Sequence, residues 1–399
     1  MDTAKSPGCD CSSQPEETPT PITLMDKMPA AGVVAADEPC CGPPAGPPSG
    51  PDERPGYAIH GFVAEFLSTP IGKVPRVKTR LGPADIIGTV LTRVGIGRND
   101  YQVAPGIYAV GSPDQEAPVL VTANYKLTFD HVRRELAGQN AWLLVLDTRG
   151  INVWCAAGKG TFATGELVKR IIETGLDKLV SHRRIIVPQL GATGVASKKV
   201  RKLSGFKVVW GPIRAADIIA FLENDLKADR KMRMVTFTLA ERLVLVPVEI
   251  SLVLKPALWV LLALFVLSGI GPGIFSLAGA WERGLWAAGA ILLGILSGAG
   301  LAPLLLPWIP GTTFASKGIL TGLVLVLPAA IAAGLAEGIA GFLALLFMAA
   351  ALSSYLAMNF TGTSPFTSPS GVEKEMRRYI PIQAGMAVCG LALWIGSAF

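Results

Sequence analysis

The pattern of apolar and polar positions between residues 57 and 242 alternates short apolar runs with amphipathic stretches. Short runs rich in β-branched residues predict buried strands, and the stretches between them have the period of helices. This alternation predicts an α/β domain with a Rossmann-like parallel sheet and flanking helices. The predicted strands are 118–122, 141–147, 184–189 and 206–210, and the predicted helices are 128–136, 164–174, 197–202 and 215–223.

One predicted helix and three predicted turns matter most for the interior and for function. In the helix at 164–174, Leu167, Ile171 and Ile172 are expected to share the buried face. Parallel α/β sheets bind ligands beyond the carboxyl ends of their strands. The turns where we expect a site therefore follow Leu146, Val187 and Val209.

From about residue 244 the pattern changes to long apolar segments. Only 11 of the chain's Lys, Arg, Asp and Glu residues lie in residues 243–399. Segments of about 18–25 apolar residues are long enough to cross a bilayer, so this region is predicted to be an all-α transmembrane bundle of about five helices. The predicted spans are 256–279, 284–308, 318–335, 338–360 and 379–399.

The charges between these spans favour one orientation. The segment 227–242 carries five basic and two acidic residues, and the loop before the last span adds Lys374, Arg377 and Arg378. The opposite side offers Arg283 beside Glu282, and Glu337. The positive-inside rule then predicts a multi-pass protein of the cytoplasmic membrane, with residues 57–242 in the cytoplasm. The bundle contains no His or Asp, which favours an anchor over a transporter.

Residues 1–56 form a third part with a different composition. They hold 12 of the 30 Pro residues, no aromatic residue and a net charge of −6, so we expect a disordered tail. They show no signal-peptide pattern. The tail carries Cys9, Cys11, Cys40 and Cys41. These are either accessible thiols without a role or thiolates that capture a soft metal ion.

The net charge of +6 over the whole chain leaves +11 for residues 57–242. A basic domain beside a membrane can attract anionic lipid, a phosphate-bearing cofactor or an acidic protein. No nucleic-acid-binding motif is present, so we expect no nucleic-acid partner.

The most informative stretch is 150–162, GINVWCAAGKGTF, between a predicted strand and a predicted helix. It presents Cys155 beside Trp154 and small residues, over which a large flat ligand could approach the backbone. The residues disfavour a P-loop, because its first Gly falls on Val153 and its hydroxyl position on Gly160. A Cys nucleophile would need His60, His131 or His182, none at a recognisable spacing. A Cys that simply packs beside Trp154 stays open.

Several stretches together resemble one known family. NVWCAAGK (152–159) resembles the signature of the mercury-methylating corrinoid proteins, which are similar to the large subunit of the corrinoid iron–sulfur protein of acetyl-CoA synthesis. The resemblance covers roughly residues 75–399 and leaves the tail outside. It continues in PGIYAVGSPDQEAPVLVTANYKLTFD (105–130), VPQLGATG (187–194), SGFKVVWGPIRAADI (204–218) and NFTGTSPFTSPSGVEKEMR (359–377).

This resemblance implies a cofactor, a reaction and partners. The α/β domain would bind a cobalamin-type corrinoid, with the Cys155 thiolate as the lower axial ligand of cobalt. The methyl group would come from a methylated pterin or a methyl donor protein, and would pass to mercuric ion to give methylmercury. A small ferredoxin with two iron–sulfur clusters would restore the reduced cobalt. The family's iron–sulfur ligands are absent, because no second Cys lies between residues 57 and 388.

The chemistry of a thiolate ligand agrees with that implication. Mercuric ion is an electrophile, so methyl must leave with the bonding electrons or as a radical. An anionic donor opposite the methyl group eases this departure, and a His cannot supply that charge. Further corrin contacts are expected on the same turns, although a plain turn role is an equal alternative for those outside the Cys155 stretch. The candidates are Asn152, Val153, Trp154, Ala156, Ala157, Gly158, Lys159, Thr122, Asn124, Gln189, Gly191, Gly211 and Pro212.

Three functions follow as hypotheses. The first is a corrinoid-dependent mercury methyltransferase, and the second is a membrane-anchored corrinoid methyl carrier of one-carbon metabolism. The third is a transporter with a regulatory corrinoid domain, which the charge-poor bundle disfavours.

Overall fold

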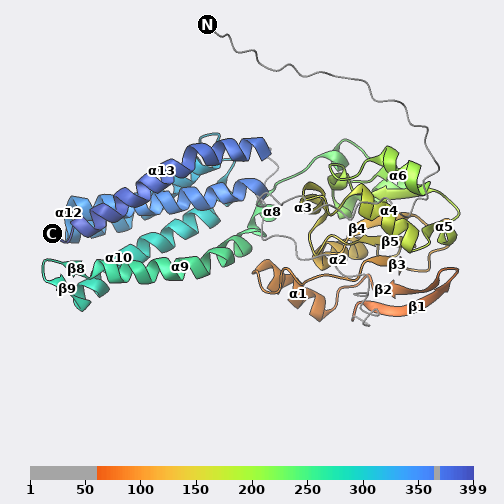
Figure 1. Cartoon of the computed structure of the whole chain (residues 1–399), viewed down its shortest axis with the longest axis horizontal. Helices are drawn as coiled ribbons and strands as arrows, with labels where there is room; N and C mark the ends of the chain where they lie inside the picture. The colour runs from red at the N-terminus through yellow and green to blue at the C-terminus, as the bar shows by residue number, and fades with distance from the viewer. Residues whose placement is uncertain (1–60, 364–368) are drawn as a thin grey trace, which may run out of the picture. The chain divides into compact units, whose positions relative to one another are not determined.

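The computed structural model describes residues 61–363 and 369–399; the tail, its four cysteines and His60 lie outside the described residues. The first part is built on a mixed seven-stranded sheet of order β1-β2-β3-β5-β4-β6-β7 (Figure 1). The strands are β1 (Val63–Thr69), β2 (Gly72–Val77), β3 (Gly106–Val110), β4 (Val119–Ala123), β5 (Ala141–Leu146), β6 (Arg184–Val187) and β7 (Lys207–Trp210). The helices are α1 (Pro83–Arg93), α2 (Lys126–Glu135), α3 (Val153–Gly158), α4 (Thr164–Glu173), α5 (Leu176–Leu179), α6 (Ser197–Ser204) and α7 (Ile218–Glu223), with 3-10 turns η1 (Gln189–Gly191), η2 (Ala215–Asp217) and η3 (Lys231–Arg233).

Four strands confirm the predicted parallel sheet. β5, β4, β6 and β7 lie next to one another in that order, and each neighbouring pair is parallel. The chain passes from β4 to β5 through α2, and then crosses back beyond β4 to β6. The strand order therefore reverses between β4 and β6, and in open α/β sheets such a reversal is where ligands bind.

The other three strands were not predicted, and they make the sheet mixed. β3 runs antiparallel to β5, and β1 runs antiparallel to β2. Only residues 111–118 join β3 to β4, and this loop contains no helix. A parallel crossover needs a dozen or more residues, so β3 takes its antiparallel place on the far side of β5.

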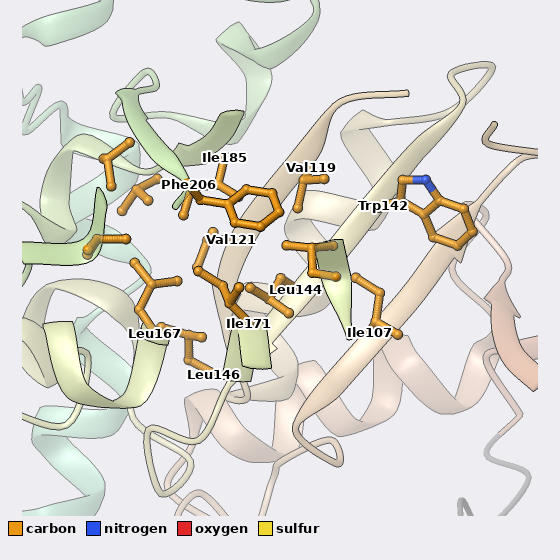
Figure 2. Close-up of a cluster of buried hydrophobic side chains, with 14 of the residues drawn as sticks. Ile107, Val119, Val121, Trp142, Leu144, Leu146, Leu167, Ile171, Ile185 and Phe206 are labelled. Carbon is orange, nitrogen blue, oxygen red and sulfur yellow. The ribbon is translucent and has the colours of Figure 1, made fainter. Parts of the chain in front are cut away.

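The core lies on both faces of β5, whose six residues are all buried. Leu144 and Leu146 point to the face covered by α4, where they meet Leu167 and Ile171 (Figure 2). The predicted third member of that helix face is wrong, since Ile172 is 63% exposed. One helical residue turns the side chain by about 100°, which carries position 172 from the sheet to solvent.

The second part is helical and very apolar. Within residues 61–363 and 369–399, four stretches are long and apolar enough to cross a membrane, namely Leu239–Ser268, Leu277–Leu305, Phe314–Asn359 and Ser370–Gly396. They comprise α8 (Leu239–Leu243), α9 (Val246–Ser268), α10 (Leu277–Ile295), the π-helical turn η4 (Leu296–Leu301), α11 (Ala302–Leu305), α12 (Phe314–Asn359) and α13 (Pro369–Gly396). Short elements complete it: β8 (Ile270–Gly271), β9 (Ile274–Phe275) and the 3-10 turn η5 (Phe360–Thr363).

The longest helix, α12, is a hairpin of two helical arms. Gly338 has φ 72° and ψ −174°, which breaks the helix. The Ser353 hydroxyl donates to the Gly318 carbonyl at 2.6 Å, whereas 35 residues of straight helix would hold them about 50 Å apart. The two arms correspond to the predicted spans 318–335 and 338–360. The predicted span 256–279 lies too far along the chain, because α9 covers Val246–Ser268 and residues 270–275 hold β8 and β9.

Sequence analysis missed a buried polar junction among these helices. Arg283 on α10 pairs with Glu337 at 2.9 Å and donates to the Ser268 carbonyl at 3.1 Å and the Ser397 hydroxyl at 2.9 Å. Its guanidinium also lies over the Trp394 ring. The Arg283 guanidinium thus joins α9, α10, α12 and the end of α13. Arg283 and Glu337, which were expected in the loops between spans, form a buried ion pair here.

Candidate functional site

The carboxyl ends of the four parallel strands meet at one edge of the sheet. Ala123 of β4 pairs with Leu146 of β5, and Val187 of β6 pairs with Trp210 of β7. The turns that follow these four residues therefore lie along the same edge. The candidate residues named from the sequence belong to these strand ends, to the turns after them or to α3, which follows the turn after β5, so they gather along this edge in the fold.

The turn from β5 to α3 is held by the side chain of Asn124. Its Oδ1 accepts hydrogen bonds from the Thr148 amide at 3.0 Å, the Thr148 hydroxyl at 2.8 Å and the Gly150 amide at 3.0 Å. Its Nδ2 donates to Asp147 at 3.4 Å and Gln102 at 3.3 Å. Asn124 is 2% exposed. It is therefore an internal brace of the Cys155 turn, the turn role that the sequence left open.

Backbone geometry makes this turn sharp. Arg149 and Gly150 both have positive φ, 56° and 70°. The left-handed conformation is unfavourable for Arg, and the bonds to Asn124 and from the Arg149 amide to Asp147 (3.0 Å) hold it in place. The chain can thus leave a buried strand and enter α3 within a few residues.

Asn152 caps α3, and its Oδ1 accepts from the Cys155 amide at 2.9 Å. This bond fixes Cys155 in the first turn of the helix. Val153, Ala156 and Ala157 face the core, whereas Trp154 is 40% exposed and Cys155 is half-buried. The candidate stretch therefore divides into an anchoring face and a presenting face, which carries Trp154, Cys155, Gly158 and Lys159.

The surface beside the sulfur is open on the side of the small residues. A Cβ atom placed on Gly158 or Gly160 would have no atom within 4 Å. A flat ligand can reach this surface without meeting a side chain. The site thus offers one half-buried sulfur, an exposed aromatic ring and a bare glycine surface, and this donor set fits a macrocycle bound through a single axial ligand.

The turn after β6 packs tightly against the α3 region. A Cβ on Gly191 would lie 2.4 Å from the Phe162 ring, and one on Gly194 would lie 2.1 Å from the Phe162 carbonyl oxygen. Only glycine allows this approach. Gly191 therefore serves packing in this structure, and Gly194, which the sequence analysis did not single out, serves it equally. A pair of glycines three residues apart after a strand was the available signal.

The four remaining candidate residues differ in how exposed they are. Thr122 is 1% exposed, and Gly211 and Pro212 are buried. Gln189 is partly exposed, and its side chain accepts a hydrogen bond from Arg233. Contact of these four residues with a corrin stays a prediction. Glu166, also unforeseen, accepts from the Asp147 amide at 2.9 Å and ties α4 to the end of β5.

We expect Asn124→Ala to disorder the Cys155 turn while the sheet stays folded. The change removes the acceptor for two buried amides, those of Thr148 and Gly150, which should destabilise the turn by about 3 kcal/mol. Hydrogen exchange of the 147–156 amides should accelerate strongly. The matched control is Asn140→Ala, because Asn140 is exposed and accepts one bond, from the Ser112 amide at 2.9 Å. Equal exchange in the two variants would contradict the bracing role.

Comparison with known proteins shows that this part of the chain is similar in sequence to one protein family. Residues 95–222 match the family model of the CO dehydrogenase/acetyl-CoA synthase delta subunit. The chain is 37% identical over 131 residues to the acetyl-CoA decarbonylase/synthase complex subunit gamma of Methanopyrus kandleri, covering 32% of this chain and 28% of that protein. It is 34% identical over 119 residues to the corrinoid/iron–sulfur protein large subunit of Moorella thermoacetica, covering 29% of this chain and 26% of that protein.

The family-model match includes Cys155 and ends before the helical part. The chain spans only about a quarter of the length of these curated relatives. The matched segment therefore resembles part of a corrinoid/iron–sulfur protein and of acetyl-CoA decarbonylase/synthase subunits. The long apolar helices lie outside the residues that the family model matches.

Proposed function

We propose that residues 61–233 bind a corrinoid through Cys155 and that the chain works as a corrinoid-dependent methyltransferase. The observation that carries this proposal is the half-buried sulfur of Cys155, which a capped and braced turn presents at the edge where the strand order reverses. The name of the Moorella relative supports the cofactor. A bound corrinoid supplies a cobalt centre that can accept and release a methyl group.

Cys155 would hold the metal of the cofactor through its sulfur, and the neighbouring residues would keep Cys155 in place. Asn152 fixes the backbone of Cys155, Asn124 fixes the turn before it, and Gly158 leaves room for the macrocycle. Neither described His can replace this sulfur at the same edge. His182 lies just before β6, at the opposite edge of the sheet, where its Nε2 is 3.0 Å from the Ala117 carbonyl oxygen. His131 lies on α2, the helix that follows β4 in the sequence.

For the acceptor of the methyl group, we propose mercuric ion. The stretch 152–159 resembles the signature of the mercury-methylating corrinoid proteins. A thiolate adds negative charge to the metal that it ligates, which favours transfer of the methyl group to an electrophile. Mercuric ion is such an acceptor, and this reasoning distinguishes it from nucleophilic acceptors.

The second candidate is a methyl carrier of acetyl-CoA synthesis type, with a different acceptor. The comparisons favour this second candidate. The names of the relatives given above refer to acetyl-CoA decarbonylase/synthase or to a corrinoid/iron–sulfur protein, and neither name mentions mercury. In both cases we propose a methylated pterin or a methyl donor protein as the source, and a small ferredoxin with two iron–sulfur clusters as reductant.

We further propose that the four long apolar stretches cross the cytoplasmic membrane, and that the two arms of α12 cross it separately, so that the chain spans the membrane five times. The basic residues that precede Leu239 and those near Arg377 would then lie on the cytoplasmic side, with residues 61–233.

One experiment separates the two candidates. The full chain in detergent is loaded with methylcobalamin labelled in its methyl group, and mercuric ion is added. We expect labelled methylmercury to form several-fold faster than from free methylcobalamin at the same concentration. A chain that binds methylcobalamin but gives no acceleration with mercuric ion would support the carrier of acetyl-CoA synthesis. Failure to bind any corrinoid would refute both candidates.

A further inference from the structure

Helix α1 has the reverse of the usual amphipathic arrangement. Its large apolar side chains point outward: Ile86 is 55% exposed, Ile87 59%, Val90 56% and Leu91 40%. Positions 86 and 90, and 87 and 91, are one turn apart, so the four side chains form one continuous face. Ile96, just beyond the helix, is 60% exposed and extends the apolar surface.

The inner face of the same helix is polar. Asp85 and Thr92 are buried beneath it. Asp85 pairs with Lys126 of α2 at 2.6 Å and with Arg133 at 2.8 Å, and it accepts from the Gly82 amide at 2.9 Å. Gly88 also faces inward, because a Cβ there would lie 2.4 Å from the Tyr101 hydroxyl. The orientation of α1 is therefore fixed by specific contacts.

The ionisation of Asp85 agrees with its role in fixing the orientation of α1. Burial by itself would raise the pKa of Asp85, but the hydrogen bonds from Lys126, Gly82 and Arg133 outweigh it and lower the pKa to about 2. Asp85 is thus charged at any physiological pH. A buried ion pair of this kind costs desolvation, so its use here is to fix which face of α1 turns outward rather than to add stability.

An outward face of adjacent Ile, Val and Leu residues marks an interaction site. The position of the first candidate membrane span identifies the partner. η3 ends at Arg233 and that span begins at Leu239, so five residues separate them. A fully extended chain of this length covers about 20 Å. The α/β part is therefore tied close to any bilayer that the helices cross.

Charge favours the same partner. Arg93 and Arg98 follow the apolar face along the chain, and residues 57–242 carry a net charge of +11. Basic side chains beside a short apolar helix face are typical of helices that lie in the headgroup region of a bilayer.

We propose that α1 is an interfacial helix whose side chains at Ile86, Ile87, Val90 and Leu91 insert into the bilayer surface, a second attachment beside the spanning helices. This inference rests on the proposed membrane location. Two attachments hold the α/β part in a fixed orientation, because a single short tether would let it rotate, and they set the direction in which the Cys155 edge faces.

The test uses the full chain in nanodiscs of phosphatidylglycerol and phosphatidylethanolamine. A photoreactive benzoylphenylalanine replaces Ile87 or Val90, and adducts are identified by mass spectrometry after illumination. The matched control is the same replacement of Ile172, which is 63% exposed on α4. A second control replaces Trp259, which is 72% exposed on α9 and reports on the spanning helix itself.

We expect lipid adducts at positions 87, 90 and 259, with yields at 87 and 90 several-fold above that at 172. Adducts with lipid at 259 but only with protein, or with nothing, at 87 and 90 would overturn the interfacial helix and leave the membrane location standing. Absence of lipid adducts at 259 would overturn both. All four replacements are at exposed positions, so the fold should tolerate each of them.

Discussion

Cys155→Ala is expected to abolish methyl transfer to mercuric ion and to remove the sulfur-to-cobalt signature from the optical and EPR spectra of the corrinoid-loaded chain. The side chain is half-buried and sits in the first turn of a helix capped by Asn152. Alanine keeps the helix and its packing, because the core-facing residues of α3 are Val153, Ala156 and Ala157. Loss of function would therefore report the missing sulfur.

The matched control is Cys389→Ala. Cys389 is the second cysteine among the described residues, and it is exposed on α13, within a predicted span. We expect this variant to keep both the spectrum and the transfer rate. If Cys155→Ala retained the full rate, or if Cys389→Ala lost it, the ligand assignment would be wrong.

A conservative variant tests why the donor is a thiolate. Cys155→His offers a neutral imidazole at the same position. We expect this variant to bind corrinoid but to methylate mercuric ion poorly, because the negative charge of the donor is lost. Transfer at the wild-type rate would show that only ligation matters and would weaken the argument for an electrophilic acceptor.

The sequence predicted the parallel half of the sheet and its functional edge because those signals are local. Apolar runs such as 141–147 have too few polar residues to be anything but buried, and the turns after them follow from strand direction. The placement of Cys155 on such a turn could be predicted for the same reason. The ligand itself came from resemblance and not from this pattern.

What the sequence could not predict depends on contacts between distant residues. For Asn124 the sequence left a ligand contact and a turn role equally open, because it only follows a strand; in the structure its side chain turns inward to Thr148 and Gly150. Likewise, Arg283 and Glu337 are 54 residues apart, and only the helix packing brings them together. A polar residue at a strand end has the same pattern in sequence whether it faces a ligand or a turn.

The orientation of helix α1, whose apolar face points outward, also could not be predicted from the sequence. Its periodicity indicates which residues share a face, but periodicity cannot say which face is inside. Asp85 decides this, through partners on α2 that lie more than 40 residues further along the chain. The ion pairs that orient α1 are therefore the part of the fold where one substitution should have the largest effect on stability.

Arg133→Met is expected to destabilise the α/β part by about 3–5 kcal/mol, since removal of one member of a buried ion network leaves its partners charged and unpaired. Arg133 is fully buried and pairs with Asp130 at 2.7 Å and Asp85 at 2.8 Å. It also donates to the Lys78 carbonyl, which ties α2 to the end of β2. Native-state hydrogen exchange in β4 and α2 of the full chain would measure the loss.

Arg134→Met is the matched control, because the Arg134 side chain is 48% exposed and forms an ion pair with Glu135 at the surface. Its effect should stay within about 0.5 kcal/mol. Similar exchange rates in the two variants would contradict a structural role for the network.

The pH dependence supplies an independent measure of the same network. The pKa of Asp85 is lowered from 3.8 to about 2, so its contribution, about 2 kcal/mol, is present above about pH 4 and is lost as the pH falls towards 2. In Arg133→Met the pKa of Asp85 should rise towards its ordinary value, because one of the groups that stabilise the carboxylate is gone. The acid-induced loss of stability between about pH 4 and about pH 2 should then shrink. An unchanged acid profile would mean that Lys126 and the Gly82 amide alone hold the charge of Asp85, and that Arg133 contributes packing rather than orientation of α1.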